Sequence, residues 1–297
     1  MSYNPSKFLW VYFLLIGYAT VYAQKNAEVA YFNYVIVPKS DFKEGTGNAS
    51  LNSAEFNLVT PTIHLAKNTK LNTILYYRLS GYNFNETSLE SLNIPEQFHE
   101  VKATFLMRHT FNANWELLFV PRINLRSDFE ASIGKKDLFP ALSAIGMRTS
   151  QNNPKRRWGF GLNYNNDFGK NSIMPILAFT YTSENMRFST YFPNNASVVF
   201  FSKKKMEYGF AYSADPTLVH VTTNNAIEYI RTLNFYVHPT FAYNITSNVW
   251  LNLKAGYVLR RNFDLYTSNF ESPSSDFENK LKASVFVQIG LSLRSKQ

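Results

Sequence analysis

The chain has 297 residues, no cysteine, and a formal net charge of +9. The lack of cysteine excludes a disulfide framework, a thiolate metal centre, a cysteine nucleophile and a lipid anchor on a lipobox cysteine. Lysine and arginine are spread along the chain rather than gathered in one segment, so nucleic acid is not an expected partner.

Residues 1–23 have the three parts of a secretory signal peptide. Lys7 is the only charge before an apolar run over 8–19, and Val21-Tyr22-Ala23 places small residues at the positions that signal peptidase reads. The apolar run is too short for a membrane-spanning helix, which takes about 20 residues. We therefore predict cleavage between Ala23 and Gln24, and export of a mature chain over 24–297.

From about residue 27 onward, apolar side chains recur at every second position. The pattern is typical of β-strands with one apolar and one polar face. It is clearest at the C-terminal end, where one face consists of Leu281, Ala283, Val285, Val287, Ile289, Leu291 and Leu293. The same alternation occupies residues 115–126, 233–245 and 249–260.

Several of these segments hold their alternation for a dozen residues or more. Strands of soluble β-sandwiches usually have about five or six residues. A long strand with an apolar face and a charged face fits a closed barrel in a membrane, because lipid requires every backbone group to be paired. The mean hydropathy of −0.23 agrees, since only alternate side chains of such a barrel face lipid. We predict a single all-β domain, a transmembrane antiparallel up-and-down barrel in the outer membrane of a Gram-negative cell.

The connections alternate between short turns and longer polar loops. Short turns are predicted at 67–69, 112–114, 152–154, 183–185, 203–205 and 246–248, and longer loops near 38–50, 85–97, 127–137, 213–224 and 263–279. Outer-membrane barrels have short periplasmic turns, long external loops and an even number of strands. We expect 12 to 14 strands and favour 14. The uncertainty lies in 185–202, where Phe192-Pro193-Asn194-Asn195 is either an outer turn or a kink within one strand.

Four segments carry a resemblance to a known family. They are 138–146, LFPALSAIG, 158–169, WGFGLNYNNDFG, 175–181 and 192–196. The chain resembles an uncharacterised family of Gram-negative outer-membrane β-barrels, described as a domain of unknown function. The resemblance implies the fold and the location, and no activity. One departure is the C-terminus, since barrels of this class often end on an aromatic residue used by the assembly machinery, whereas this chain ends Arg294-Ser295-Lys296-Gln297.

Basic side chains outnumber acidic ones, such as Glu116, on the polar register of the predicted strands. The candidate lumen bases are Arg78, Lys102, Arg108, Arg122, Arg126, Lys254, Arg260 and Arg294. An open lumen lined this way would favour anionic solutes. A closed lumen would instead pair the arginines with Glu116, tyrosine hydroxyls and backbone carbonyls. A barrel of about a dozen strands permits either arrangement.

Catalytic and metal sites have little support in the sequence. His238 could act with Ser284 or Asn252 only if neighbouring strands bring them together, as a nucleophile and its base require. The acidic residues Asp264, Glu271, Asp276 and Glu278 lack the spacing of an EF-hand calcium loop. We therefore predict no catalytic residue, cofactor or metal.

The expected function is that of an integral outer-membrane barrel of unassigned substrate, such as a narrow pore with a basic lumen. The alternatives are an enzyme acting on lipid or lipopolysaccharide, and a surface-binding barrel that uses its long loops. The expected partners are outer-membrane lipids, lipopolysaccharide and the barrel assembly machinery.

Overall fold

A computed structural model describes residues 28–43, 47–85, 94–167, 171–202, 205–222, 227–269 and 280–295. The predicted signal peptide and the Ala23–Gln24 cleavage site lie outside these residues. Among the described residues, no helix is both long and apolar enough to cross a membrane.

The described residues contain sixteen strand elements and one 3-10 helix, η2 (Lys135–Asp137). The strands are β1 (Glu28–Asp41), β2 (Asn48–Val59), β3 (Ile63–Ala66), β4 (Thr69–Asn85), β5 (Gln97–Thr110), β6 (Trp115–Ser127), β7 (Leu138–Thr149), β8 (Arg156–Asn165), β9 (Ser172–Thr182), β10 (Met186–Phe192), β11 (Asn195–Ser202), β12 (Met206–His220), β13 (Tyr229–Asn244), β14 (Val249–Tyr266), β15 (Lys280–Leu281) and β16 (Ser284–Arg294).

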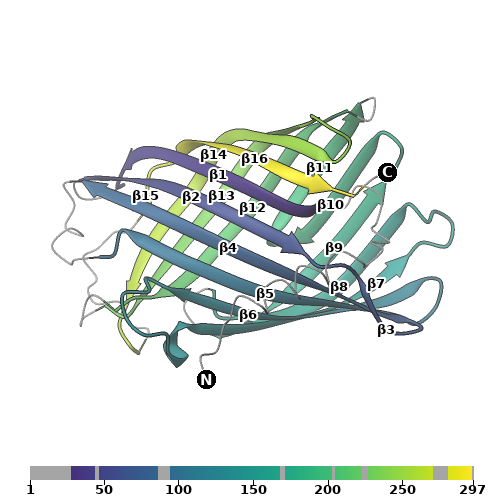
Figure 1. Cartoon of the computed structure of the whole chain (residues 1–297), viewed down its shortest axis with the longest axis horizontal. Helices are drawn as coiled ribbons and strands as arrows, with labels where there is room; N and C mark the ends of the chain where they lie inside the picture. The colour runs from purple at the N-terminus through teal and green to yellow at the C-terminus, as the bar shows by residue number, and fades with distance from the viewer. Residues whose placement is uncertain are drawn as a thin grey trace, which may run out of the picture.

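The strands form one antiparallel sheet that closes on itself (Figure 1). β1 pairs with both β2 and β16, and β14 pairs with both β13 and β16, so the first and last strands meet. β3 and β15 are short additions to β4 and β14 and add no wall strand. The remaining 14 strands make the barrel wall, which confirms the favoured strand count.

The segment 185–202 is a hairpin of two strands. β10 and β11 pair from Met186↔Phe200 to Tyr191↔Asn195. The N–H of Asn194 donates to the Tyr191 carbonyl at 2.8 Å, so Phe192–Asn195 is a turn rather than a kink. This turn lies at the same end of the barrel as the longer connections, here called the loop end. The opposite end, with the short turns and both ends of the described chain, is here called the turn end.

The two faces of each strand differ as the alternation predicts. On β16, Val285, Val287, Ile289, Leu291 and Leu293 are exposed, whereas Phe286, Gln288 and Ser292 between them are buried. The exposed set points outward from the closed sheet, and the buried set points into the lumen. An apolar outer belt around a closed antiparallel wall is the arrangement that spans an outer membrane.

The wall is uneven at the loop end. β12, β13 and β14 have 15, 16 and 18 residues, whereas β10 and β11 have 7 and 8. The loop-end part of β12 reaches β6, from which it is separated along the wall by β7 to β11, and pairs with it at His220↔Ser127. Leu218 of β12 is therefore buried against Phe139 of β7 and Tyr229 of β13. The barrel is narrowed at this end by its own strands.

Candidate functional site: the lumen

An apolar cluster fills the lumen at the loop end. Its members lie on or next to β1, β2, β4, β5 and β12 to β16: Val35, Val37, Phe42, Ala49, Leu51, Tyr82, Phe98, Val219, Val221, Ile227, Ile230, Val258, Phe263, Leu265, Leu281 and Phe286. We call this cluster the apolar seal. Phe84 of β4 and Phe263 of β14 meet edge to face with ring centroids 5.0 Å apart, although three wall strands separate β4 from β14. Side chains of strands that are not neighbours in the wall therefore meet inside the lumen.

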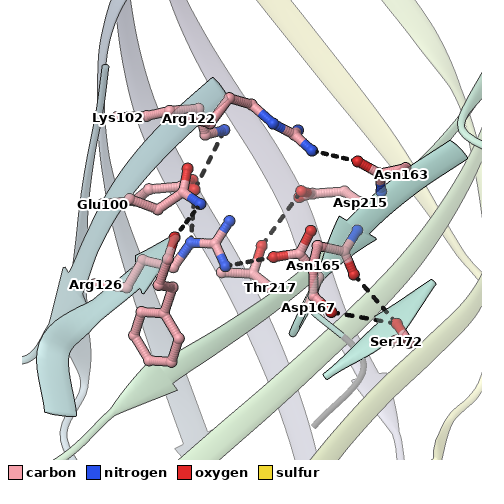
Figure 2. A network of polar contacts seen from close by, with 12 residues as sticks. Glu100, Lys102, Arg122, Arg126, Asn163, Asn165, Asp167, Ser172, Asp215 and Thr217 are labelled. Carbon is pink, nitrogen blue, oxygen red and sulfur yellow. Dashed lines mark hydrogen bonds and ion pairs between the residues drawn. The ribbon is translucent and has the colours of Figure 1, made fainter. Parts of the chain in front are cut away.

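A network of charged side chains lies in the lumen beside Tyr82 and Phe98 of the seal (Figure 2). Glu100 is its centre and is only 3% exposed. It accepts a hydrogen bond from Arg126 Nε at 2.8 Å, and it forms ion pairs with Arg78 Nη2 at 2.9 Å and Lys102 Nζ at 3.2 Å. Two further carboxylates, Asp167 and Asp215, pair with Arg126 and Arg78 respectively, each at 2.6 Å. We call these six residues the mid-lumen network.

Strand register explains why the network forms. Arg78 of β4 lies opposite Glu100 of β5, which lies opposite Arg126 of β6, so three inward-facing positions fall in one row. Asp215 reaches Arg78 from β12, on the far side of the lumen. A buried charge left without a partner is costly, and this arrangement gives each of these arginines at least two polar partners.

Three of the predicted lumen bases, Arg78, Lys102 and Arg126, thus belong to one network. Arg108 faces inward nearer the turn end, with its Nε 3.9 Å from Glu116. Glu116 pairs more closely with Arg157 of β8, a lumen base that the sequence reading missed. Arg294 pairs with Glu207 at 2.8 Å. Most lumen bases therefore have a carboxylate partner.

Arg260 does not face the lumen, so its predicted placement is wrong. The register of β13 with β14 shifts between Phe235↔Arg260 and Tyr236↔Val258, which leaves Leu259 as an extra residue. The bulge reverses the two faces beyond it. Arg260 is exposed and its guanidinium lies 5.9 Å from the Phe235 ring centroid, whereas Arg261 is buried inside and donates to the Ser40 hydroxyl.

Two predicted bases have no carboxylate partner among the described residues. Arg122 donates to the side-chain oxygen of Asn163 at 2.7 Å, and its Nε is buried without an acceptor. Lys254 of β14 forms no hydrogen bond or ion pair with any described residue, although Glu55 and Glu28 act on it electrostatically. Lys254 lines the polar cavity described next, whereas Arg122 is not among the residues that line it.

A polar cavity of about 520 Å³ occupies the lumen beside the mid-lumen network. Lys254, His238 and Gln288 line one side of it, and Glu55, Arg78 and Lys102 line the other. Tyr31, Tyr76, Tyr236 and Phe286 add aromatic surface. The cavity therefore offers charge of both signs together with ring faces, which suits a small solute with a charged group and an apolar part.

The lumen bases differ in exposure, and Arg294 at the turn end is only 10% exposed. The side chain of Arg126 is 4% exposed and that of Arg78 11%, whereas Arg108 and Arg157 reach 30% and 31%. The residues of the apolar seal, in contrast, are all buried. The described residues of the loop end therefore bury an apolar cluster, whereas Arg108 and Arg157 nearer the turn end are partly exposed.

The structure does not bring the candidate catalytic residues together. His238 lies opposite Gly256, its Nδ1 lies 3.2 Å from the Pro239 carbonyl, and its ring meets Phe286. Asn252 donates instead to Ser292, and Ser284 lies opposite Val258. Asp264 of the rejected calcium set pairs with Arg231 at 2.6 Å, while Glu271, Asp276 and Glu278 lie outside the described residues. No group of metal-binding side chains occurs in the described part of the chain.

Comparison with family models decides the affiliation of the chain. The model of the domain of unknown function DUF6268 matches residues 19–294. The chain belongs to this family. This agrees with the resemblance noted in the sequence. No curated protein matches the chain.

Similar solved structures are outer-membrane barrels. The COG4313 outer membrane channel from Pseudomonas putida F1 is 12% identical, with 92% of this chain and 97% of that chain covered and a TM-score of 0.49. The toluene transporter TodX of Pseudomonas putida is 10% identical, with coverages of 92% and 90% and a TM-score of 0.41. Outer membrane phospholipase A from Escherichia coli is 13% identical, with coverages of 94% and 96% and a TM-score of 0.36. This DUF6268 protein is an integral β-barrel of the outer membrane, as its closed wall and apolar belt require.

Proposed function

We propose that this DUF6268 barrel is a transport-type protein, not an enzyme, whose mid-lumen cavity binds a small solute that carries an anionic group. The observation that carries the proposal is Lys254, an inward-facing cation that lines a polar cavity and has no hydrogen-bond or ion-pair partner among the described residues. An unpartnered charge in a confined space is unfavourable unless a ligand or water satisfies it.

The neighbours of Lys254 fit a carboxylate or phosphate group. Gln288 lies directly opposite it on β16 and can donate from its amide, while His238 lies on the adjacent strand β13. A hydrogen bond to a charged group contributes about 1.5–3 kcal/mol, more than a bond between neutral groups. The aromatic side chains of the cavity wall would contact the rest of the solute.

In the closed state of the transport path, the apolar seal blocks the lumen at the loop end. The seal consists of side chains on wall strands rather than of a separate folded domain. A plug of this kind opens through side-chain and loop movements, on timescales far shorter than unfolding of the wall. In this proposal the cavity opens to the periplasm through the turn end, where Arg108 and Arg157 are partly exposed.

Binding of inorganic phosphate to the purified, refolded barrel tests the proposal. We expect Lys254→Gln to weaken phosphate binding about tenfold or more, as loss of one charge-assisted contact predicts. Lys155→Gln, in the exposed turn between β7 and β8, is the matched control and should bind like the unchanged protein. Equal binding by the two variants, or the absence of phosphate binding by the unchanged barrel, would contradict the proposal.

A further inference from the structure

The hairpin of β10 and β11 is too short for the wall in which it stands (Figure 1). These strands have 7 and 8 residues, between β9 with 11 and β12 with 15. A tilted strand needs about 9–11 residues to cross the hydrocarbon core. The tip of the hairpin, at Phe192–Asn195, is therefore expected to end within the membrane.

The apolar belt on the neighbouring strand locates the tip. Phe192 lies opposite Leu177 of β9, and both side chains face outward and are exposed. β9 continues past this pair to Ile173, whose side chain is 69% exposed on the same outer face. Since the apolar belt extends beyond the tip, the wall has a notch at hydrocarbon depth. We define the notch by Pro175 on β9, the turn Phe192–Asn195, and Ala214 and Pro216 on β12.

Prolines stand where the notch exposes the strand edges. The Ser183 N–H donates to the Met186 carbonyl at 2.8 Å, so odd-numbered backbone groups of β9 point toward β10. Leu177 is the last β9 residue paired with β10. Pro175 lies two residues further toward the loop end, so its backbone nitrogen also points toward the β10 side. Its ring removes a backbone donor that would otherwise face the notch unpaired.

The same arrangement occurs on the other side of the notch. The Ala214 N–H donates to the Asn194 carbonyl at 2.8 Å, so even-numbered groups of β12 point toward β11. Pro216 is the next residue of this parity and lies past the end of the hairpin. An unpaired N–H group costs several kcal/mol in hydrocarbon. Proline has no N–H group, so Pro175 and Pro216 remove this cost at the first unpaired position on each edge of the notch.

The cavity reaches the notch from the inside. Asn195, Ser213 and Ala214 belong to its lining, together with Lys254 on β14, one strand away from β12, and Lys102 on β5 across the lumen. Ser213 faces inward and Ala214 follows it at the strand edge, so the cavity extends to the edge of β12 beside the notch. Asn195 at the hairpin tip is itself exposed.

We propose that the notch is a lateral portal between the membrane and the cavity, used by an amphiphile with one alkyl chain and an anionic head group. The head group enters the cavity toward Lys254 and Lys102, while the chain stays in the hydrocarbon beside Ile173 and Phe192. This inference rests on the proposed solute-binding function and names the chemical class of the solute. It also gives the cavity an entrance that does not require the apolar seal to open.

Single-cysteine labelling tests the portal, because the natural chain has no cysteine. Ser213→Cys places a thiol at the portal, and Ala211→Cys places one on the same inner face of β12, behind the paired wall of β11. The full mature barrel is reconstituted in phosphatidylcholine vesicles and treated with a maleimide on a dodecyl chain. We expect Ser213→Cys to react at least about tenfold faster than Ala211→Cys, as a direct path from the bilayer predicts.

A second variant separates a lateral path from entry through the turn end. Asn195→Trp fills the notch, and Asn195→Gln is its matched control. We expect the tryptophan to slow labelling of Ser213→Cys by the dodecyl reagent and to leave labelling by a small water-soluble maleimide unchanged. Folding of each variant is checked by heat-modifiable gel mobility. Equal rates at 213 and 211, or no effect of the tryptophan, would overturn the portal. Phosphate binding that still depends on Lys254 would then leave the proposed function intact.

Discussion

The rings of Tyr82 and Phe263 meet edge to face, with centroids 5.4 Å apart, across a lumen that separates β4 from β14. This contact belongs to the apolar seal, in which side chains of separate wall strands meet inside the lumen. Replacing Phe263 by alanine removes the ring that Tyr82 and Phe84 share. We expect Phe263→Ala to produce single-channel events in planar bilayers where the unchanged barrel is closed. Phe160→Ala, which removes an exposed outer ring, is the control and should remain closed; conductance by both or neither would count against the seal.

Glu100 holds three bases of the mid-lumen network. Glu100→Gln keeps the shape and removes the charge, which leaves Arg78 and Arg126 with one carboxylate each. Removing one member of a buried ion pair typically costs about 3–5 kcal/mol. We expect a loss of this size in the free energy of unfolding, measured by urea titration in lipid vesicles. Glu184→Gln, in the exposed turn between β9 and β10, should have no effect.

Gly256 of β14 faces His238 of β13 at very close range. A Cβ at this position would lie 2.6 Å from the His238 Cβ and closer still to the Val237 carbonyl oxygen. We expect Gly256→Ala to destabilise the barrel by about 1–3 kcal/mol, because backbone must shift to accept it. At Gly81 the nearest atom would be 3.8 Å away, so Gly81→Ala should be tolerated. The measurement is the temperature at which each folded variant changes to the mobility of the unfolded chain in a heat-modifiable gel assay.

Asp137 of η2 fastens the end of β12 through His220, with 2.7 Å between its carboxylate and the imidazole Nδ1. Burial acts to raise the pKa of Asp137, but hydrogen bonds from the Gly134 N–H, Ser127 and His220 outweigh it and hold the pKa below its usual value. A lowered folded-state pKa gives stability that is present above the unfolded value, about 3.9, and is lost as pH falls through the folded value.

We therefore expect protease sensitivity of the loop end to increase below about pH 4 in the unchanged barrel. An acid-stable protease such as pepsin provides the measurement. In Asp137→Asn, the loop end should be cleaved rapidly even at the highest pH at which pepsin is active. Its rate of cleavage should no longer depend on titration of residue 137. Identical profiles for the two proteins would show that this contact does not secure the loop end.

The predicted signal peptide gives a further test. Mass spectrometry of the protein from outer-membrane fractions should show an N-terminus at Gln24, because small residues at Val21 and Ala23 flank the cleavage position. Ala23→Arg should block cleavage there. A mature protein that retains residues 1–23 would contradict the assignment.

The sequence by itself determined the class of fold. Alternation such as Leu281 to Leu293 predicts long two-faced strands, and the spacing of turns predicts an even number of them. Both were confirmed, because a period of two and an apolar outer face are local properties that each strand carries alone. The Phe192–Asn195 turn could not be settled in this way, since a turn and a kink share the same residues.

Only the tertiary structure decided which side chains meet inside the lumen. The sequence singled out the bases but not their partners Glu100, Asp167 and Asp215, since pairing depends on register between strands and on contacts across the barrel. Arg260 was placed inward because the alternation gave no sign of the bulge at Leu259, which put Arg261 inside instead. The apolar seal and the notch likewise arise from residues far apart in the chain. Strand periodicity fixes which face a side chain occupies, whereas closure of the sheet fixes what that side chain meets.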